Sequence, residues 1–347
     1  MYIFIRWYSS DVQRVEEGYS TQFYPKLANT FRLCVGGLPF SLGDILWALL
    51  IIWLLYKLVQ CFIFFWKPNR LQRLKLLLWQ PLFKFIQTLA VVYIIFNVCW
   101  GINYNRQGIA TQLGLSLDEY TVKELAAIND VLVFKINHSK AQLLVHQCKP
   151  LSTDSLYSFT VAAYQNVSKK YSFLTYHHPA IKTSLWGWVG NYTGFLGYYN
   201  PITGEAQVNT TVPAFTQPFT ACHEVAHQLG YAKEMEANFV GYLAASASND
   251  ERFKYAVYTD LFTYANRTLY IADTMLARKY QRLLAPDVLK DFKERRAFYN
   301  AHRSFMEPII RFLYSKFLQS NQQPMGILSY DEVTSFIIAY YKKFGTI

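Results

Sequence analysis

An apolar run of 22 residues, from Ile45 to Trp66, is the feature that most restricts how this chain can fold. It reads ILWALLIIWLLYKLVQCFIFFW, and Lys57 is its only charged residue. A helix of this length, at about 1.5 Å per residue, spans the ~30 Å hydrocarbon core of a bilayer. The alternative is a helix buried in the core of a soluble protein. We expect residues 45–66 to form a transmembrane helix.

A second apolar run covers residues 85–102 and contains 18 residues without a charge. We expect a second transmembrane helix here, with a buried core helix as the alternative for so short a run. Tryptophans 47, 66 and 100 lie near the ends of the two runs, where amphipathic rings favour the membrane interface. Only 16% of the chain is charged, against about 25% in a typical soluble domain, which agrees with a membrane protein.

The connector between the two runs, residues 67–84, indicates how the chain is oriented. It contains no acid and five basic residues, Lys67, Arg70, Arg73, Lys75 and Lys84. Short basic loops stay on the cytoplasmic side of a membrane. We therefore expect residues 1–44 to be an extracytoplasmic N-terminal segment and residues 103–347 an extracytoplasmic domain.

The net charge of +11 does not by itself indicate a nucleic-acid partner. Nucleic-acid-binding surfaces combine a basic cluster with interleaved aromatic residues, and no such cluster stands out in this sequence. Residues flanking the apolar runs explain most of the positive charge. We expect the bilayer, and no nucleic acid, to be a partner.

The remaining chain has the composition of a soluble, mainly helical domain. Thr121 and Glu124 form a capping-box pattern that predicts a helix to about Gln147, and a second helix is expected over residues 154–170. Residues 182–218 contain five glycines and three prolines, which predicts short strands and turns. Helical periodicity then returns from Thr220. The predicted breaks fall near Gly230, residues 248–250, Pro286 and residues 320–329.

The motif that carries chemistry is His-Glu-Val-Ala-His at residues 223–227. Histidines at i and i+4 share one face of a helix, where both imidazoles can bind one Zn²⁺. Glu224 lies beside that face and can take a proton from zinc-bound water. Ordinary helix-surface residues are the alternative reading. We expect one catalytic zinc ion, with His223 and His227 as ligands and Glu224 as general base.

A third ligand must come from elsewhere in the chain. A metzincin would have His or Asp at position 233, where this chain has Lys233. Residues 234–238, Glu-Met-Glu-Ala-Asn, resemble the Glu-x-x-Ala-Asp ligand helix of membrane-associated gluzincin peptidases. This resemblance implies that Glu234 is the third ligand and that Asn238, in place of the usual Asp, hydrogen-bonds a ligand histidine. Glu236 is the alternative ligand, but it lies about 200° around a helix from Glu234.

Further motifs extend the resemblance over nearly the whole chain. They are LPFSLGDIL (38–46), NPITGEAQVN (200–209), PFTACHEVAHQLGYAKEMEANF (218–239), YNAHRSFM (299–306) and GILSYDEV (326–333). As a set they resemble an uncharacterised bacterial family of membrane-anchored, zinc-peptidase-like proteins that is catalogued as a domain of unknown function. The resemblance implies a zinc site and a multi-pass protein of the bacterial inner (cytoplasmic) membrane. It implies no particular substrate.

One further segment and one further residue are candidates for the site. A glycine-rich strand within residues 187–209 either pairs with an extended peptide substrate or forms an ordinary hairpin packed on the motif helix. His302, beside Arg303, either stabilises the oxyanion of a tetrahedral intermediate or has a structural role.

The sequence therefore predicts a mainly α fold with a small β element: two N-terminal transmembrane helices followed by a gluzincin-like zinc-peptidase domain. The expected function is a membrane-anchored zinc metallopeptidase acting on a peptide or protein through zinc-bound water activated by Glu224. The alternatives are a non-catalytic membrane scaffold or binding protein that retains the zinc site, and a zinc hydrolase of a non-peptide envelope substrate. An intact Glu224 argues against the scaffold, because binding zinc needs only the ligands.

Overall fold

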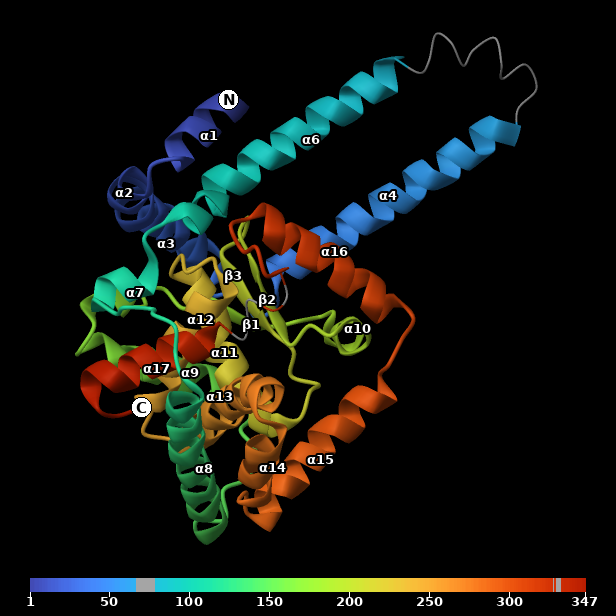
Figure 1. Ribbon diagram of the computed structural model, residues 1–347. Coiled ribbons are helices and arrows are strands. Elements are labelled where there is room, and N and C mark those ends of the chain that lie inside the picture. Colours follow the sequence, from blue (N-terminus) through green and yellow to red (C-terminus); the bar gives the residue numbers. More distant parts are fainter. Residues whose placement is uncertain (67–78, 327, 329–331) are drawn as a thin grey trace.

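The computed structural model describes residues 1–66, 79–326, 328 and 332–347. Most of the chain is helical, around one small sheet, and two long helices extend together away from the rest of the molecule (Figure 1). These are α4 (Leu42–Trp66) and α6 (Trp79–Cys99). The part of the predicted basic connector from residue 67 to residue 78 lies outside the described residues.

Within the described part of the chain, α4 is the one helix long and apolar enough to cross a membrane, over Leu42–Ile63. None of the most apolar 18-residue stretch of that span is buried by the protein. The apolar part of α6 is shorter, Phe83–Cys99. The last residues of the predicted second run are buried in protein instead. Trp100 and Ile102 lie beyond the end of α6, Trp100 just before the 3₁₀ helix η2 (Gly101–Asn105) and Ile102 within it. The structure thus has one candidate membrane helix where two were predicted.

The N-terminal segment packs against the domain that carries the motif. It forms α1 (Tyr2–Ser9), α2 (Val12–Arg14), a π-helix, η1 (Val15–Phe23), and α3 (Tyr24–Val35). Its apolar side chains share a small core with Trp100, Tyr104 and Ala232. A buried ion pair of 2.7 Å joins Arg106 to Glu16. The segment is therefore part of the same folded body.

The sheet has three strands in the order β1-β3-β2. Strand β1 (Ile181–Thr183) pairs in parallel with β3 (Glu205–Val208), and β2 (Gly197–Asn200) pairs antiparallel with β3. Residues 201–204 form the turn between β2 and β3, which confirms the turn expected there. β2 is an edge strand, since no further strand pairs with it among the residues described.

The first turn of α4 is fixed to this sheet by two buried carboxylates. Glu205 accepts hydrogen bonds from the backbone N–H groups of Leu42 (3.0 Å) and Gly43 (2.6 Å). Asp44 accepts one from the backbone N–H of Leu185 at 2.6 Å and another from the Tyr198 hydroxyl. A carboxylate at a helix N-terminus satisfies free N–H groups and complements the helix dipole. The candidate membrane helix is thereby joined directly to β2 and β3.

The other helices build the main core around α11 and α12. Helix α11 contacts the sheet on one side and α9, α12 and α13 on others. The remaining helices are α7 (Gly108–Leu113), α8 (Val122–Val145), α9 (Thr153–Ser168), η3 (Ser172–Leu174), α10 (Gly187–Thr193), η4 (Ala214–Thr216), α11 (Gln217–Gln228), α12 (Glu234–Ser246), α13 (Glu251–Ala272), α14 (Thr274–Arg282), α15 (Pro286–Ala301), α16 (Met306–Ser320) and α17 (Val333–Phe344).

Several local predictions are confirmed by these bounds. The capping box of Thr121 and Glu124 is present at the start of α8. The expected breaks occur before α13, at Pro286 and after α16. Two breaks after Thr220 were not predicted: Asp273 separates α13 from α14, and residues 302–305 separate α15 from α16. The side chain of Asp273 caps α14 by accepting from the backbone N–H of Leu276 at 2.9 Å. The mainly helical class with a small sheet is confirmed.

Candidate metal centre

The His-Glu-Val-Ala-His motif lies on α11, in the middle of the main core. Gly230 has φ +88°, a left-handed conformation that glycine adopts without strain, and the chain turns there as expected. The backbone N–H of Tyr231 bonds back to the carbonyl of Ala226 at 3.2 Å, which closes the helix end. Only five residues separate Gln228, where α11 ends, from Glu234, where α12 begins. The tight turn brings the first residue of α12 alongside the motif.

Three side chains converge in the space between α11 and α12. Oε2 of Glu234 lies 3.3 Å from Nε2 of His223 and 3.6 Å from Nε2 of His227. One ligand atom from each residue lies within 4.8 Å of the other two, and all three residues are buried. Ligands bound tetrahedrally to Zn²⁺ at 2.0–2.1 Å are about 3.3 Å apart. The His223, His227 and Glu234 group could therefore hold a metal ion.

The unused hydrogen-bonding capacity of Glu234 supports this fit. Its Oε2 is buried and has no hydrogen-bond partner among the residues described. Its Oε1, in contrast, accepts a hydrogen bond of 2.5 Å from the Tyr314 hydroxyl. A buried carboxylate oxygen without a partner is costly unless a ligand satisfies it. The carboxylate is thus held by one oxygen and presents the other to the two imidazoles.

Contacts from outside the donor group also orient the two helices that carry it, α11 and α12. Nδ1 of His227 donates to the carbonyl of Tyr231 at 2.8 Å, which leaves Nε2 to face the centre. The backbone N–H of Glu234 donates to Oε1 of Gln323 at 2.9 Å. The indole of Trp100 donates to the carbonyl of His227 at 3.3 Å. The end of α6 and the C-terminal region both support the ligand helices.

Without a metal, the charges of this group favour a proton shared between His227 and Glu234. Burial lowers the pKa of His227, but the carboxylate of Glu234, 3.6 Å from its Nε2, opposes this effect and raises that pKa to about 9. Burial raises the pKa of Glu234, but the adjacent imidazoles of His223 and His227 outweigh this effect and hold that pKa well below its usual range. A metal cation must displace this proton when it binds.

Glu224 is a second buried carboxylate beside the group. Its Oε2 has no hydrogen-bond partner in the described chain. Its Oε1 lies against Gly197 of β2, where an added Cβ would be only 2.7 Å away. Burial raises the pKa of Glu224 to about 7, with Glu234 acting in the same direction and the two histidines opposing. The absence of a side chain at Gly197 is what lets this carboxylate sit beside the strand.

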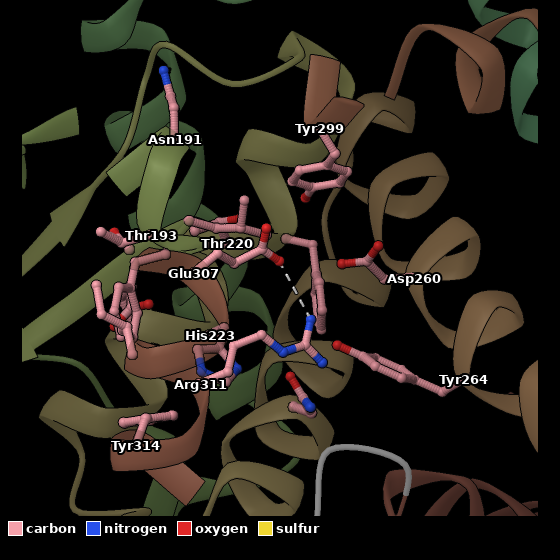
Figure 2. A pocket seen from close by; sticks show the side chains of 18 of the residues that line it. Asn191, Thr193, Thr220, His223, Asp260, Tyr264, Tyr299, Glu307, Arg311 and Tyr314 are labelled. Atoms are coloured by element: carbon pink, nitrogen blue, oxygen red, sulfur yellow. Dashed lines mark ion pairs between the residues drawn. The ribbon is translucent and has the colours of Figure 1, made fainter. Parts of the chain in front are cut away.

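A pocket of about 570 Å³ opens onto these residues. Its walls include His223, Glu224 and Asn238, and Figure 2 shows His223 surrounded by side chains from other elements. Residues 193–197 leading into β2 form one wall. The other walls come from α13, from the end of α15 and from α16, which supply Asp260, Tyr264, Arg267, Tyr299, Asn300, Arg303, Glu307, Ile310, Arg311 and Tyr314.

The other predicted site residues lie as follows. Asn238 is buried in the pocket wall, and its Nδ2 has no hydrogen-bond partner among the described residues, so its bond to a ligand histidine stays a prediction. Glu236 points away from the centre: it packs against Gly108, and its Oε1 lies 3.9 Å from Nζ of Lys233. The structure groups Glu234, and not Glu236, with the histidines.

His302 ends α15 next to the pocket. Its Nδ1 donates to the carbonyl of Phe298 at 2.8 Å, and the two rings lie 4.4 Å apart. The adjacent residues Asn300 and Arg303 line the pocket, whereas His302 is not among its lining residues. Its part in stabilising an oxyanion stays a prediction.

Sequence reasoning missed Tyr314 and Gln323, which contact Glu234 directly. They lie 80 and 89 residues further along the chain. The only signal near them was the pair of C-terminal motifs, which carried no chemistry of their own.

A family model described as "Protein of unknown function (DUF3810)" matches residues 19–338. The match covers most of the chain, which therefore belongs to this family. No curated protein and no solved structure matches the chain.

Proposed function

We propose that this member of the DUF3810 family is a membrane-anchored zinc-dependent metallopeptidase. His223, His227 and Glu234 would hold one zinc ion, and Glu224 would act as general base. The observation that carries this proposal is the proximity of a buried two-histidine, one-glutamate donor set to a second buried carboxylate with an unpartnered oxygen.

The donor set favours a catalytic over a structural site. Structural zinc sites are closed by four protein ligands, whereas catalytic sites have three and keep one position open. When bound, zinc would polarise a substrate carbonyl and lower the pKa of a water molecule. Three donors are grouped here and one of them, His223, lines the pocket, which agrees with that pattern.

Glu224 favours hydrolysis over a scaffold that merely retains metal. Its carboxylate lies outside the donor group yet faces the same pocket as His223. A carboxylate in that position can accept a proton from the attacking water and deliver it to the leaving amine. A binding protein would gain nothing from a buried, unpartnered carboxylate oxygen there.

The edge strand β2 favours a peptide over a non-peptide substrate. Its first residue, Gly197, and the residues just before it line the pocket next to Glu224. An extended peptide can add to such an edge through main-chain hydrogen bonds. The strand would then hold the scissile bond beside the metal-binding group.

The same proposal includes the membrane. Helix α4 would span the bilayer and α6 would return across it, since the two project in the same direction from the same end of the domain (Figure 1). With the basic connector in the cytoplasm, the pocket would face the outer side of the bacterial inner membrane.

Metal analysis combined with a proteomic comparison tests this function. Purified protein should contain about one zinc per chain. Membranes with wild-type protein should contain new peptide termini that are absent with Glu224→Gln. Identical termini in the two samples, with zinc present in both, would favour the scaffold.

A further inference from the structure

Helix α16 has two sides of opposite character. Glu307, Ile310, Arg311 and Tyr314 line the pocket and recur at the spacing of one helix face. The other side is apolar and exposed to solvent. Its exposed residues are Met306, Ile309, Phe312 and Leu313, with 48, 55, 61 and 60% of their surface accessible.

Helix α10 extends this apolar surface. Ser304, just before α16, donates from its hydroxyl to the carbonyl of Tyr192 on α10 at 2.8 Å. Leu185 and Trp188, before and within α10, are also exposed. We call Leu185, Trp188, Met306, Ile309, Phe312 and Leu313 the apolar rim. The rim borders the pocket, because the inner sides of both helices line it.

Contacts with α4 and α6 fix the rim at the level where these two projecting helices meet the domain. The indole of Trp186 donates to the carbonyl of Asp44, in the first turn of α4, at 3.3 Å. Toward the C-terminal end of α16, the ring of Phe317 lies 6.1 Å from the ring of Phe96, which is near the end of α6. Figure 1 shows α16 lying across the base of α4 and α6.

We propose that the apolar rim lies in the headgroup region of the bilayer that α4 crosses, so that the pocket opens at the membrane surface. This rests on the membrane anchoring in the proposed function. The substrate class that fits is a peptide segment tethered to the membrane, because such a segment reaches the pocket mouth where it leaves the lipid.

Lipid is the occupant that the surface chemistry favours. A helix with one apolar and one polar side lies in the plane of a membrane interface. The rim adjoins the exposed apolar surface of α4, which begins with Leu46 and Trp47. Lys316 on the outer side of α16 can extend its charge toward anionic headgroups while its stem stays in apolar surroundings.

Single-cysteine variants of the full chain test the placement. Ile309→Cys and Leu313→Cys probe the rim, Ile52→Cys on α4 is the lipid control, and Val145→Cys at the far end of α8 is an exposed apolar control in water. The background lacks Cys34, Cys61, Cys99 and Cys148 but keeps the buried Cys222, which a thiol reagent does not reach. Each cysteine carries an environment-sensitive dye, in vesicles of phosphatidylethanolamine and phosphatidylglycerol.

We expect a lipid spin label near the headgroup to quench the rim dyes at least about twofold more than the Val145 dye, and aqueous iodide to do the reverse. Equal quenching at Ile309, Leu313 and Val145, with Ile52 quenched by the lipid label, would overturn the placement of the rim but not the membrane anchoring. Rim dyes shielded from both quenchers would indicate a protein partner and would also overturn it. An Ile52 dye quenched only by iodide would overturn the anchoring as well. None of these readouts depends on hydrolysis.

Discussion

The hydroxyl of Tyr314 donates a hydrogen bond of 2.5 Å to Oε1 of Glu234, and so joins α16 to the first residue of α12. The bond occupies one oxygen of the carboxylate and leaves the other directed at both imidazoles. The same tyrosine also lines the pocket. One contact therefore relates the metal-binding group to the helix that carries the apolar rim.

Tyr314→Phe should weaken zinc binding while preserving the shape of the site. The ring stays, but Glu234 loses the bond that orients it, and losses of this kind typically cost 10–100-fold in metal affinity. Competition with a zinc chelator measures the effect. Tyr299→Phe is a matched control, because Tyr299 lines the same pocket and is not one of the donor residues. Equal zinc affinities in the two variants would show that the bond does not matter for the metal.

Glu234→Ala and Glu236→Ala form a second matched pair, two residues apart on α12. Glu234→Ala removes a proposed ligand and should reduce zinc affinity by at least ~10-fold. Glu236 faces Gly108 instead, so its removal should leave the affinity nearly unchanged. Calorimetric titration with zinc measures both. Zinc binding that survives in Glu234→Ala and collapses in Glu236→Ala would reverse the ligand assignment.

Zinc affinity should rise with pH, because the cation competes with the proton on His227. That proton binds with a pKa of about 9, raised from 6.5, so the stabilisation it gives the metal-free protein is complete below about pH 6.5 and is lost as the pH rises through about 9. Over the same interval zinc should bind up to about tenfold more tightly per pH unit. Titration in buffers of different ionisation enthalpy counts the released proton. An affinity that does not change with pH would contradict a shared proton.

Local patterns in the sequence were enough to predict the motif helix, the turn at Gly230, the capping box of α8 and a small β element. Each depends on residues close together in the chain. The third proposed ligand, Glu234, was predicted from the resemblance of residues 234–238 to the gluzincin ligand helix, and it too is close in the chain, seven residues after His227.

The remaining features depend on contacts between distant segments. The parallel pairing of β1 with β3, the bonds from Glu205 to the start of α4, and the contact from Tyr314 to Glu234 have no local signature. The length of the second apolar run was also misjudged. Hydropathy alone cannot separate a lipid-facing residue from Trp100, which is buried in protein against the ring of Tyr104.

Gly197→Ala should impair hydrolysis more than zinc binding. The new Cβ would lie 2.7 Å from Oε1 of Glu224 and 2.8 Å from the carbonyl of Gln207, so the strand or the carboxylate must shift. Overpacking of this kind costs about 1–3 kcal/mol of stability. Gly37→Ala is the control, because a Cβ there meets nothing within 4 Å. Thermal unfolding, zinc affinity and peptide hydrolysis are measured on both. Unchanged hydrolysis in Gly197→Ala would show that β2 does not position Glu224.

The most direct test of the central claim is the zinc content and the peptide-hydrolysis rate of the same purified preparation, for wild type and Glu224→Gln. The substitution keeps the shape and burial of the side chain, leaves the three donor residues intact and removes only the base. We predict equal zinc content in the two proteins and hydrolysis in the wild type alone, with His223→Ala losing both. Hydrolysis by Glu224→Gln at the wild-type rate would contradict the assignment of Glu224 as general base.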